Sequence, residues 1–131
     1  MPHATIQYNQ EIAKHLNIAL LCEALRDCLA CMKDSSGKAV FPLGAIRVFA
    51  LKAEYDSVAD GKRAYPFLFV HLIIAPGRSK ELIESIGFDL TQRINSECEI
   101  LATSTVPWGA TLQIAEFVAP DYRLGSLRNN F

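Results

Sequence analysis

Apolar and polar side chains alternate over residues 3–8, which predicts a short β-strand with one face exposed to water. Between about residues 17 and 33 the apolar side chains instead recur every three or four residues. This spacing places them on one stripe of an amphipathic helix. The stripe consists of Leu21, Leu25, Cys28 and Met32. The sequence Asp34-Ser35-Ser36-Gly37 has turn chemistry and ends the predicted helix.

The middle of the chain predicts two more strands joined by a turn. The first strand runs from about residue 46 to 54, and residues 56–66 contain Asp60-Gly61 and a proline, which are typical of a turn. Residues 67–75, FLFVHLIIA, form the most apolar run of the protein. Their branched and aromatic side chains predict a central strand that is covered on both faces.

The last third of the chain predicts a long helix and a final strand. Ser79 is a candidate N-cap, and the helix extends to about residue 102. Its expected buried stripe is Ile83, Ile86, Leu90, Ile94, Cys98 and Leu101. Gly87 interrupts this helix at a cost of up to about 1 kcal/mol relative to alanine. The final strand spans about residues 110–118, and a polar tail over residues 119–131 follows it.

The order of these elements is strand, helix, strand, repeated once. Each half is a βαβ unit, in which a right-handed crossover makes the two strands parallel. We therefore expect an α+β fold, with two fused βαβ units forming a four-stranded mixed sheet and both helices on one face. The chain is predicted to be a single domain over residues 1–131, with halves at about 2–55 and 65–118. The opposite sheet face needs cover, which further subunits would supply if three sheets turned inward in a homotrimer.

Composition narrows the functional classes. Half of the 131 residues are hydrophobic and 21% are charged, which is typical of a globular domain rather than a disordered chain. The formal charge of −1 and the absence of a basic run give no reason to expect nucleic acid as a partner. No segment has the roughly 18 consecutive apolar residues of a membrane span. No basic region precedes an apolar stretch at the start, so we expect a cytoplasmic protein with no membrane partner.

The four cysteines are interpreted first as small hydrophobic residues of the two helices. Cys28 and Cys31 form a C-x-x-C sequence, which leaves redox or metal chemistry as the alternative. No second pair or nearby histidine completes a zinc site, so no metal ligands are predicted.

A few residues carry candidate chemistry. Pro2 is either a proline tolerated at the start of a strand or, once Met1 is removed, a free secondary amine. Arg47 begins the second strand, and Arg78 lies close to a helix N-terminus, where a cation and backbone N–H groups could bind a carboxylate. Either arginine could also be an ordinary solvated side chain. The other candidates, each with an ordinary packing or surface role as its alternative, are His3, Phe41, His71 and Trp108.

Four short sequences together resemble one known family. They are MPH at the start, FPLGAIR at 41–47, ADGKRAYPFLFVHL at 59–72 and GRS at 77–79. In this order they are similar to the 5-carboxymethyl-2-hydroxymuconate isomerase family of the tautomerase superfamily, from residue 2 to about 118. The tail after Pro120 matches less well.

The resemblance implies a homotrimeric isomerase of aromatic compound catabolism, acting on unsaturated 2-hydroxy or 2-keto acids without metal or organic cofactor. Pro2 would be the catalytic base. Arg47 and Arg78 would bind or polarise the carboxylate and 2-oxo groups of the substrate. His3 and His71 also match family positions and are supporting candidates for substrate binding, as is Phe41 on the pocket wall.

The physical chemistry of an amino-terminal proline suits such a role. An ordinary α-amino group titrates near ~8 and is largely protonated at neutral pH. Burial and nearby guanidinium groups both disfavour the ammonium form, and so bring its pKa toward the range where a general base works best. The alternative is a non-catalytic trimeric α/β module that binds a small acid or a protein partner. Such a module would have no use for a free amine.

Overall fold

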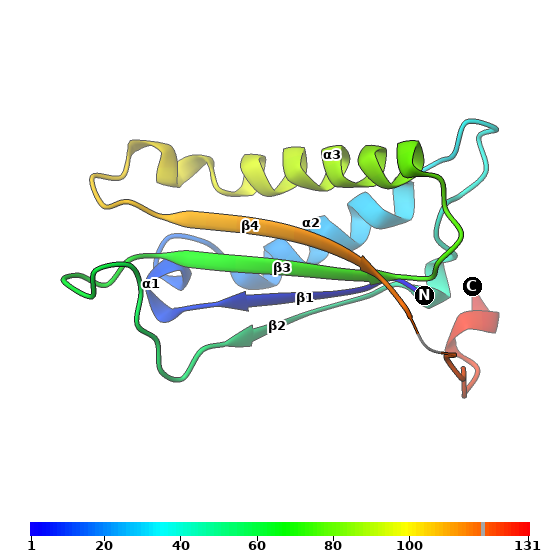
Figure 1. Ribbon diagram of the computed structural model, residues 1–131, viewed down its shortest axis with the longest axis horizontal. Helices are drawn as coiled ribbons and strands as arrows, with labels where there is room; N and C mark the ends of the chain where they lie inside the picture. The colour runs from blue at the N-terminus through cyan, green and yellow to red at the C-terminus, as the bar shows by residue number, and fades with distance from the viewer. Residues whose placement is uncertain (119) are drawn as a thin grey trace.

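The computed structural model describes residues 1–118 and 120–131. Four strands form one mixed sheet in the order β2-β1-β3-β4, as Figure 1 shows. Strands β1 (His3–Tyr8) and β2 (Arg47–Lys52) are parallel, as are β3 (Phe67–Ile74) and β4 (Gly109–Glu116). Strand β1 pairs with β3 in the antiparallel direction and joins the two halves. The predicted α+β fold of two fused βαβ units is confirmed.

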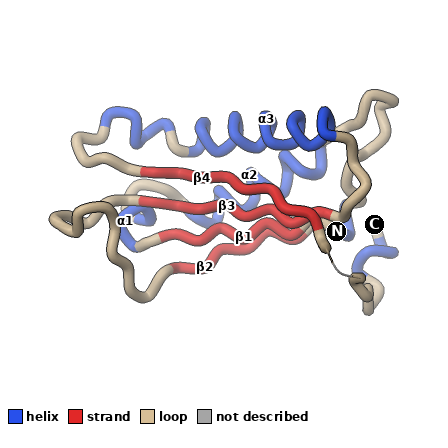
Figure 2. Tube along the Cα trace, viewed as in Figure 1, coloured by secondary structure: helices blue, strands red, loops and turns tan. Residues whose placement is uncertain are grey.

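Two long helices cover one face of this sheet (Figure 2). Helix α2 (Ile18–Cys31) begins at Asn17, whose side chain accepts a hydrogen bond from the backbone N–H of Leu20. Helix α3 (Lys80–Glu97) begins at Ser79, whose hydroxyl accepts from the N–H of Leu82, so the predicted N-cap is confirmed. Both contacts satisfy N–H groups that have no partner within the helix.

The second helix ends earlier than the sequence predicted. Helix α3 stops at Glu97, and a 3-10 helix, η2 (Glu99–Thr103), continues the chain. The backbone N–H of Leu101 donates to the carbonyl of Cys98 at 2.9 Å. A spacing of three residues between buried side chains fits a 3-10 turn as well as an α-helix, so hydrophobic periodicity does not distinguish them here.

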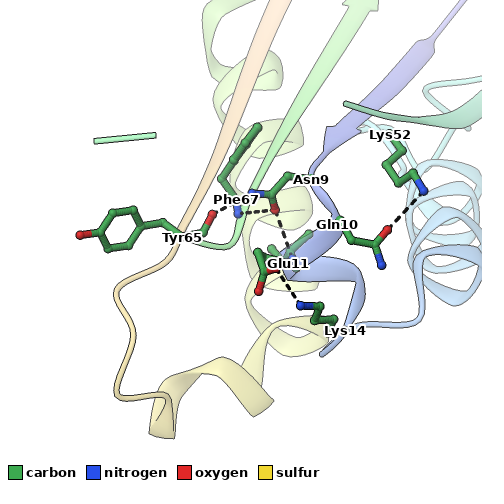
Figure 3. A network of polar contacts seen from close by, with 8 residues as sticks. Asn9, Gln10, Glu11, Lys14, Lys52, Tyr65 and Phe67 are labelled. Atoms are coloured by element: carbon green, nitrogen blue, oxygen red, sulfur yellow. Dashed lines mark hydrogen bonds and ion pairs between the residues drawn. The ribbon is translucent and has the colours of Figure 1, made fainter. Parts of the chain in front are cut away.

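A four-residue helix, α1 (Gln10–Ala13), was not predicted. It depends on Asn9, a polar residue with only 1% of its surface exposed. The Asn9 side chain accepts from the N–H groups of Ile12 and Phe67, both at 3.1 Å, and donates to the carbonyl of Tyr65 at 2.7 Å (Figure 3). One side chain therefore caps α1 and also ties the end of β1 to the start of β3.

The two faces of the sheet differ in how far other parts of the chain bury them. Alternate residues of β3 (Leu68, Val70, Leu72 and Ile74) are buried in a core shared with α2 and α3. The other side of the sheet is only partly buried, so the described residues cover the predicted central strand fully on one face and partly on the other. We call this side the open sheet face. From strand register it comprises His3, Thr5, Gln7, Arg47, Phe49, Leu51, Phe67, Phe69, His71, Ile73, Thr111, Gln113 and Ala115.

The tail returns to the amino-terminal end of the molecule (Figure 1). A short 3-10 helix, η3 (Leu127–Asn130), packs against a similar turn, η1 (Leu43–Ala45), which precedes β2. The contact is very close at Gly44. A Cβ atom added there would lie 2.5 Å from the carbonyl oxygen of Leu127 and 2.6 Å from the Cα of Arg128. Only a residue without a side chain allows the tail to approach so closely.

Candidate active site

The amino-terminal end is buried beside several cations. Pro2 is buried just before β1, and its carbonyl accepts a hydrogen bond from the backbone N–H of Arg47 at 3.0 Å. Burial, followed by the charges of Arg123, Arg78 and Arg128, lowers the pKa of the α-amine of Met1, the residue before Pro2, while Asp121 opposes the shift. The start of the chain therefore lies where burial and positive charge disfavour an ammonium group.

The Arg78 side chain is held by two backbone carbonyls and an aromatic ring. Its guanidinium donates to the carbonyls of Ala75 at 2.9 Å and Val40 at 3.3 Å, and its central carbon lies 4.9 Å from the centroid of the Phe41 ring. Burial lowers the pKa of Arg78, and the carboxylate of Glu116 opposes that shift. A partly desolvated guanidinium with further N–H donors is well suited to binding a carboxylate or an oxyanion.

Arg47 occupies a different surface. It pairs with His3 across β1 and β2, and its guanidinium donates to the carbonyls of Gly44 at 2.8 Å and Ile46 at 3.0 Å. It lines a cavity of about 350 Å³ with side chains of α2, whereas Arg78 lines another cavity of about 440 Å³. A single chain therefore places the two arginines on separate cavities rather than opposite each other.

The supporting candidates are distributed around both surfaces. His3 lies beside Pro2, and its Nδ1 is 3.4 Å from the carbonyl oxygen of Met1. His71 lies on the open sheet face between Thr5 and Gln113, with its ring 6.2 Å from that of Phe69. Phe41 is only 2% exposed, and so it supports Arg78 from beneath.

Trp108 lies away from the candidate site. It lines an apolar cavity of about 380 Å³ next to the start of β4, at the end of the sheet opposite to Pro2. Sequence reasoning also missed Arg123 and Arg128, because nothing in a polar tail indicates which residues will fold back onto the start of the chain.

Residues 1–118 and 120–131 contain neither a membrane-spanning helix nor a metal-binding cluster. Within this part of the chain no helix has the length and apolar character needed to cross a bilayer. The same residues contain no cluster of three or more His, Cys, Asp or Glu side chains placed to bind a metal ion.

Comparison with solved structures supports the assignment of the fold. The chain is similar to a crystal structure of a 5-carboxymethyl-2-hydroxymuconate delta-isomerase, with a TM-score of 0.92 and 27% identity over 99% of this chain and 92% of that one. A 5-carboxymethyl-2-hydroxymuconate isomerase from Deinococcus radiodurans R1 gives 0.84 and 22% over 98% and 92%. A fused 4-OT wild type symmetric trimer gives 0.52 and 20% over 85% and 83%. A search of curated proteins finds no match.

The two-unit sheet and these relatives define an isomerase of the tautomerase superfamily. A sequence model of one family matches residues 2–131, which includes the tail. The chain belongs to the 5-carboxymethyl-2-hydroxymuconate isomerase family. The resemblance seen in the sequence is thereby confirmed.

Proposed function

We propose that this isomerase shifts the double bonds of an unsaturated 2-hydroxy or 2-keto acid, with the Pro2 amine as general base after removal of Met1. The observation that carries the proposal is the setting of the amino-terminal end: Pro2 is buried, and burial and the charges of Arg123, Arg78 and Arg128 lower the pKa of the Met1 amine one residue before it. Such surroundings favour the uncharged form of an amine, which is the form that a general base requires. No cofactor is needed for this chemistry.

The proposed reaction conserves the proton. The amine accepts the proton of the 2-hydroxyl group, the C2–O bond becomes a carbonyl, and the double bonds shift along the chain. The ammonium then returns the proton to a carbon of the conjugated system, where a C–H bond forms. Arg78 stabilises the negative charge that develops on oxygen, which is usually the largest single contribution in such sites.

The substrate that we propose is 5-carboxymethyl-2-hydroxymuconate, since the family and the similar crystal structure with a TM-score of 0.92 are both named for it. Such an acid is the type of product formed when aromatic rings are opened, and so the proposed setting is aromatic compound catabolism in the cytoplasm. Phe41, His3 and His71 are proposed to support substrate binding.

We also propose a homotrimer, in which Arg47 completes the site of a neighbouring subunit. Arg47 and Arg78 lie on separate cavities of one chain, and the open sheet face is apolar in part, so assembly would bring unlike surfaces together. A related structure is described as a symmetric trimer. The alternative, a non-catalytic trimeric module, finds less support because the chain belongs to an isomerase family.

The test is Pro2→Ala in protein whose loss of Met1 is verified by intact mass. Ketonisation of 5-carboxymethyl-2-hydroxymuconate, followed by ultraviolet absorbance, should slow by about 100-fold or more, the usual contribution of a positioned base. Circular dichroism should be unchanged. Pro107→Ala is the matched control, because Pro107 is an exposed proline at the far end of the sheet. Equal turnover in the two variants would rule out Pro2 as the base.

A further inference from the structure

The cavity beside Arg78 has an excess of positive charge. Its volume of about 440 Å³ falls in the usual range for small-molecule sites, and Arg78, Lys38 and Arg128 contribute to its wall. Asp34 is its acidic residue, and that carboxylate is already engaged. One oxygen of Asp34 accepts from the N–H and hydroxyl of Ser36 and from the N–H of Lys38, at 2.9, 2.6 and 3.0 Å. The cavity therefore favours an anionic ligand.

Arg128 is the cation of the tail that remains available. Arg123 is paired with Asp121 at 2.9 Å, whereas no carboxylate within the described residues pairs with Arg128. Arg128 is also half-buried, while the other residues of 120–131 are exposed. A partly desolvated guanidinium without a counter-ion gains more from a bound carboxylate than a fully solvated one does.

The position of Arg128 is fixed by the backbone contact at Gly44. Since a Cβ at residue 44 would lie within 2.6 Å of the Arg128 Cα, glycine is required for the tail to reach this cavity. Gly44 belongs to the turn η1, immediately before β2 and Arg47. The turn that leads into β2 therefore also positions Arg128.

We propose that Arg128 determines specificity for polycarboxylates: it binds a second carboxylate of a substrate whose first carboxylate is bound by Arg78. This inference rests on the proposed function and extends it to a residue outside the sequence motifs. The two arginines line one cavity although they come from distant segments of the chain, the turn before α3 and the tail. The charges of both also act on the amine of Met1. A monocarboxylate would need only Arg78.

Binding of an inert acid tests this role without requiring turnover. Isothermal titration calorimetry at fixed ionic strength would use propane-1,2,3-tricarboxylate and the full chain without Met1. Arg128→Gln should weaken binding by about 10- to 100-fold, as expected when a charge-assisted bidentate pair is lost. Arg128→Lys should retain part of the affinity. Arg63→Gln, which removes an exposed arginine elsewhere, should bind like the unmodified protein.

A second variant tests the backbone contact at Gly44 that positions Arg128, rather than the charge of Arg128. Gly44→Ala leaves Arg128 in the chain but displaces it, so it should reproduce most of the loss seen with Arg128→Gln. The inference is overturned if Arg128→Gln binds the tricarboxylate as well as Arg63→Gln does, or if the unmodified protein fails to bind it at millimolar concentration.

Kinetics separate this inference from the proposed function. Arg128→Gln should raise KM for 5-carboxymethyl-2-hydroxymuconate by about 10- to 100-fold, while kcat/KM for phenylenolpyruvate, a monocarboxylate, changes by less than about threefold. Equal losses on both substrates would overturn the specificity role. If the unmodified protein turns over neither substrate, the proposed function fails, and the calorimetry alone decides whether Arg128 binds polycarboxylates.

Discussion

At the scale of single residues, Asn9 shows how one polar side chain can join distant parts of the chain. Its amide serves three backbone groups, from Ile12, Tyr65 and Phe67, in a setting closed to water. Loss of such a side chain leaves those groups without partners in the interior, which costs more than an average surface hydrogen bond.

Asn9→Ala should therefore lower the free energy of unfolding by about 2–4 kcal/mol, combining a lost helix cap with unsatisfied backbone groups. Urea unfolding at fixed protein concentration measures this change. Asn17→Ala is the comparison, because Asn17 is an exposed N-cap with one bond, and its loss should cost only about 1 kcal/mol. Similar losses for the two variants would contradict the bridging role of Asn9.

At the scale of elements, the sequence pattern predicted the strands and helix ends that are determined by residues close together in the chain. Alternation located β1 at residues 3–8, and the cap at Ser79 located the start of α3. Helix α1 was missed because its four residues bury only Ile12, too little to produce a period. The motifs indicated Pro2 and Arg78. Arg128 could not be indicated in this way, because its place depends on a contact with Gly44, 84 positions away (128 − 44).

The predicted cost of Gly87 within α3 can be measured. A Cβ at Gly87 would meet the Cδ1 atom of Ile114 at 3.5 Å, an ordinary contact, so alanine fits. Gly87→Ala should raise the free energy of unfolding by about 0.5–1 kcal/mol through improved helix propensity. Gly37→Ala, at a φ of +83°, should instead destabilise the protein. Thermal unfolding of both variants checks these opposite signs, and destabilisation by Gly87→Ala would show that this helix position needs glycine.

At the scale of the whole molecule, the described residues leave the open sheet face only partly buried. Phe49 and Leu51 on the open sheet face are 45% and 53% exposed, and Phe67 and Phe69 of β3 belong to the same face, with β1 between the two strands. Large apolar side chains gathered on one exposed face are typical of a surface that meets other subunits. This is the physical basis for the proposed homotrimer.

Phe49→Glu should convert the trimer to smaller species, since burying the carboxylate between subunits is unfavourable. Phe88→Glu is the matched control, because Phe88 is 64% exposed on α3, on the opposite side of the molecule. Sedimentation equilibrium of both variants and the unmodified chain measures the assembly. A monomeric unmodified protein, or a trimer that survives Phe49→Glu, would contradict the proposed arrangement.

The hydrogen bond between the Arg47 N–H and the Pro2 carbonyl has a practical consequence. This hydrogen bond uses the carbonyl of Pro2 and does not involve its ring nitrogen. It therefore forms equally well whether that nitrogen is a free amine or is joined to Met1 by a peptide bond. Folding spectra would then look identical for trimmed and untrimmed molecules. Under the proposed mechanism, the specific activity of a batch reports how completely the expression host's aminopeptidase has acted, and mass spectrometry should accompany every rate.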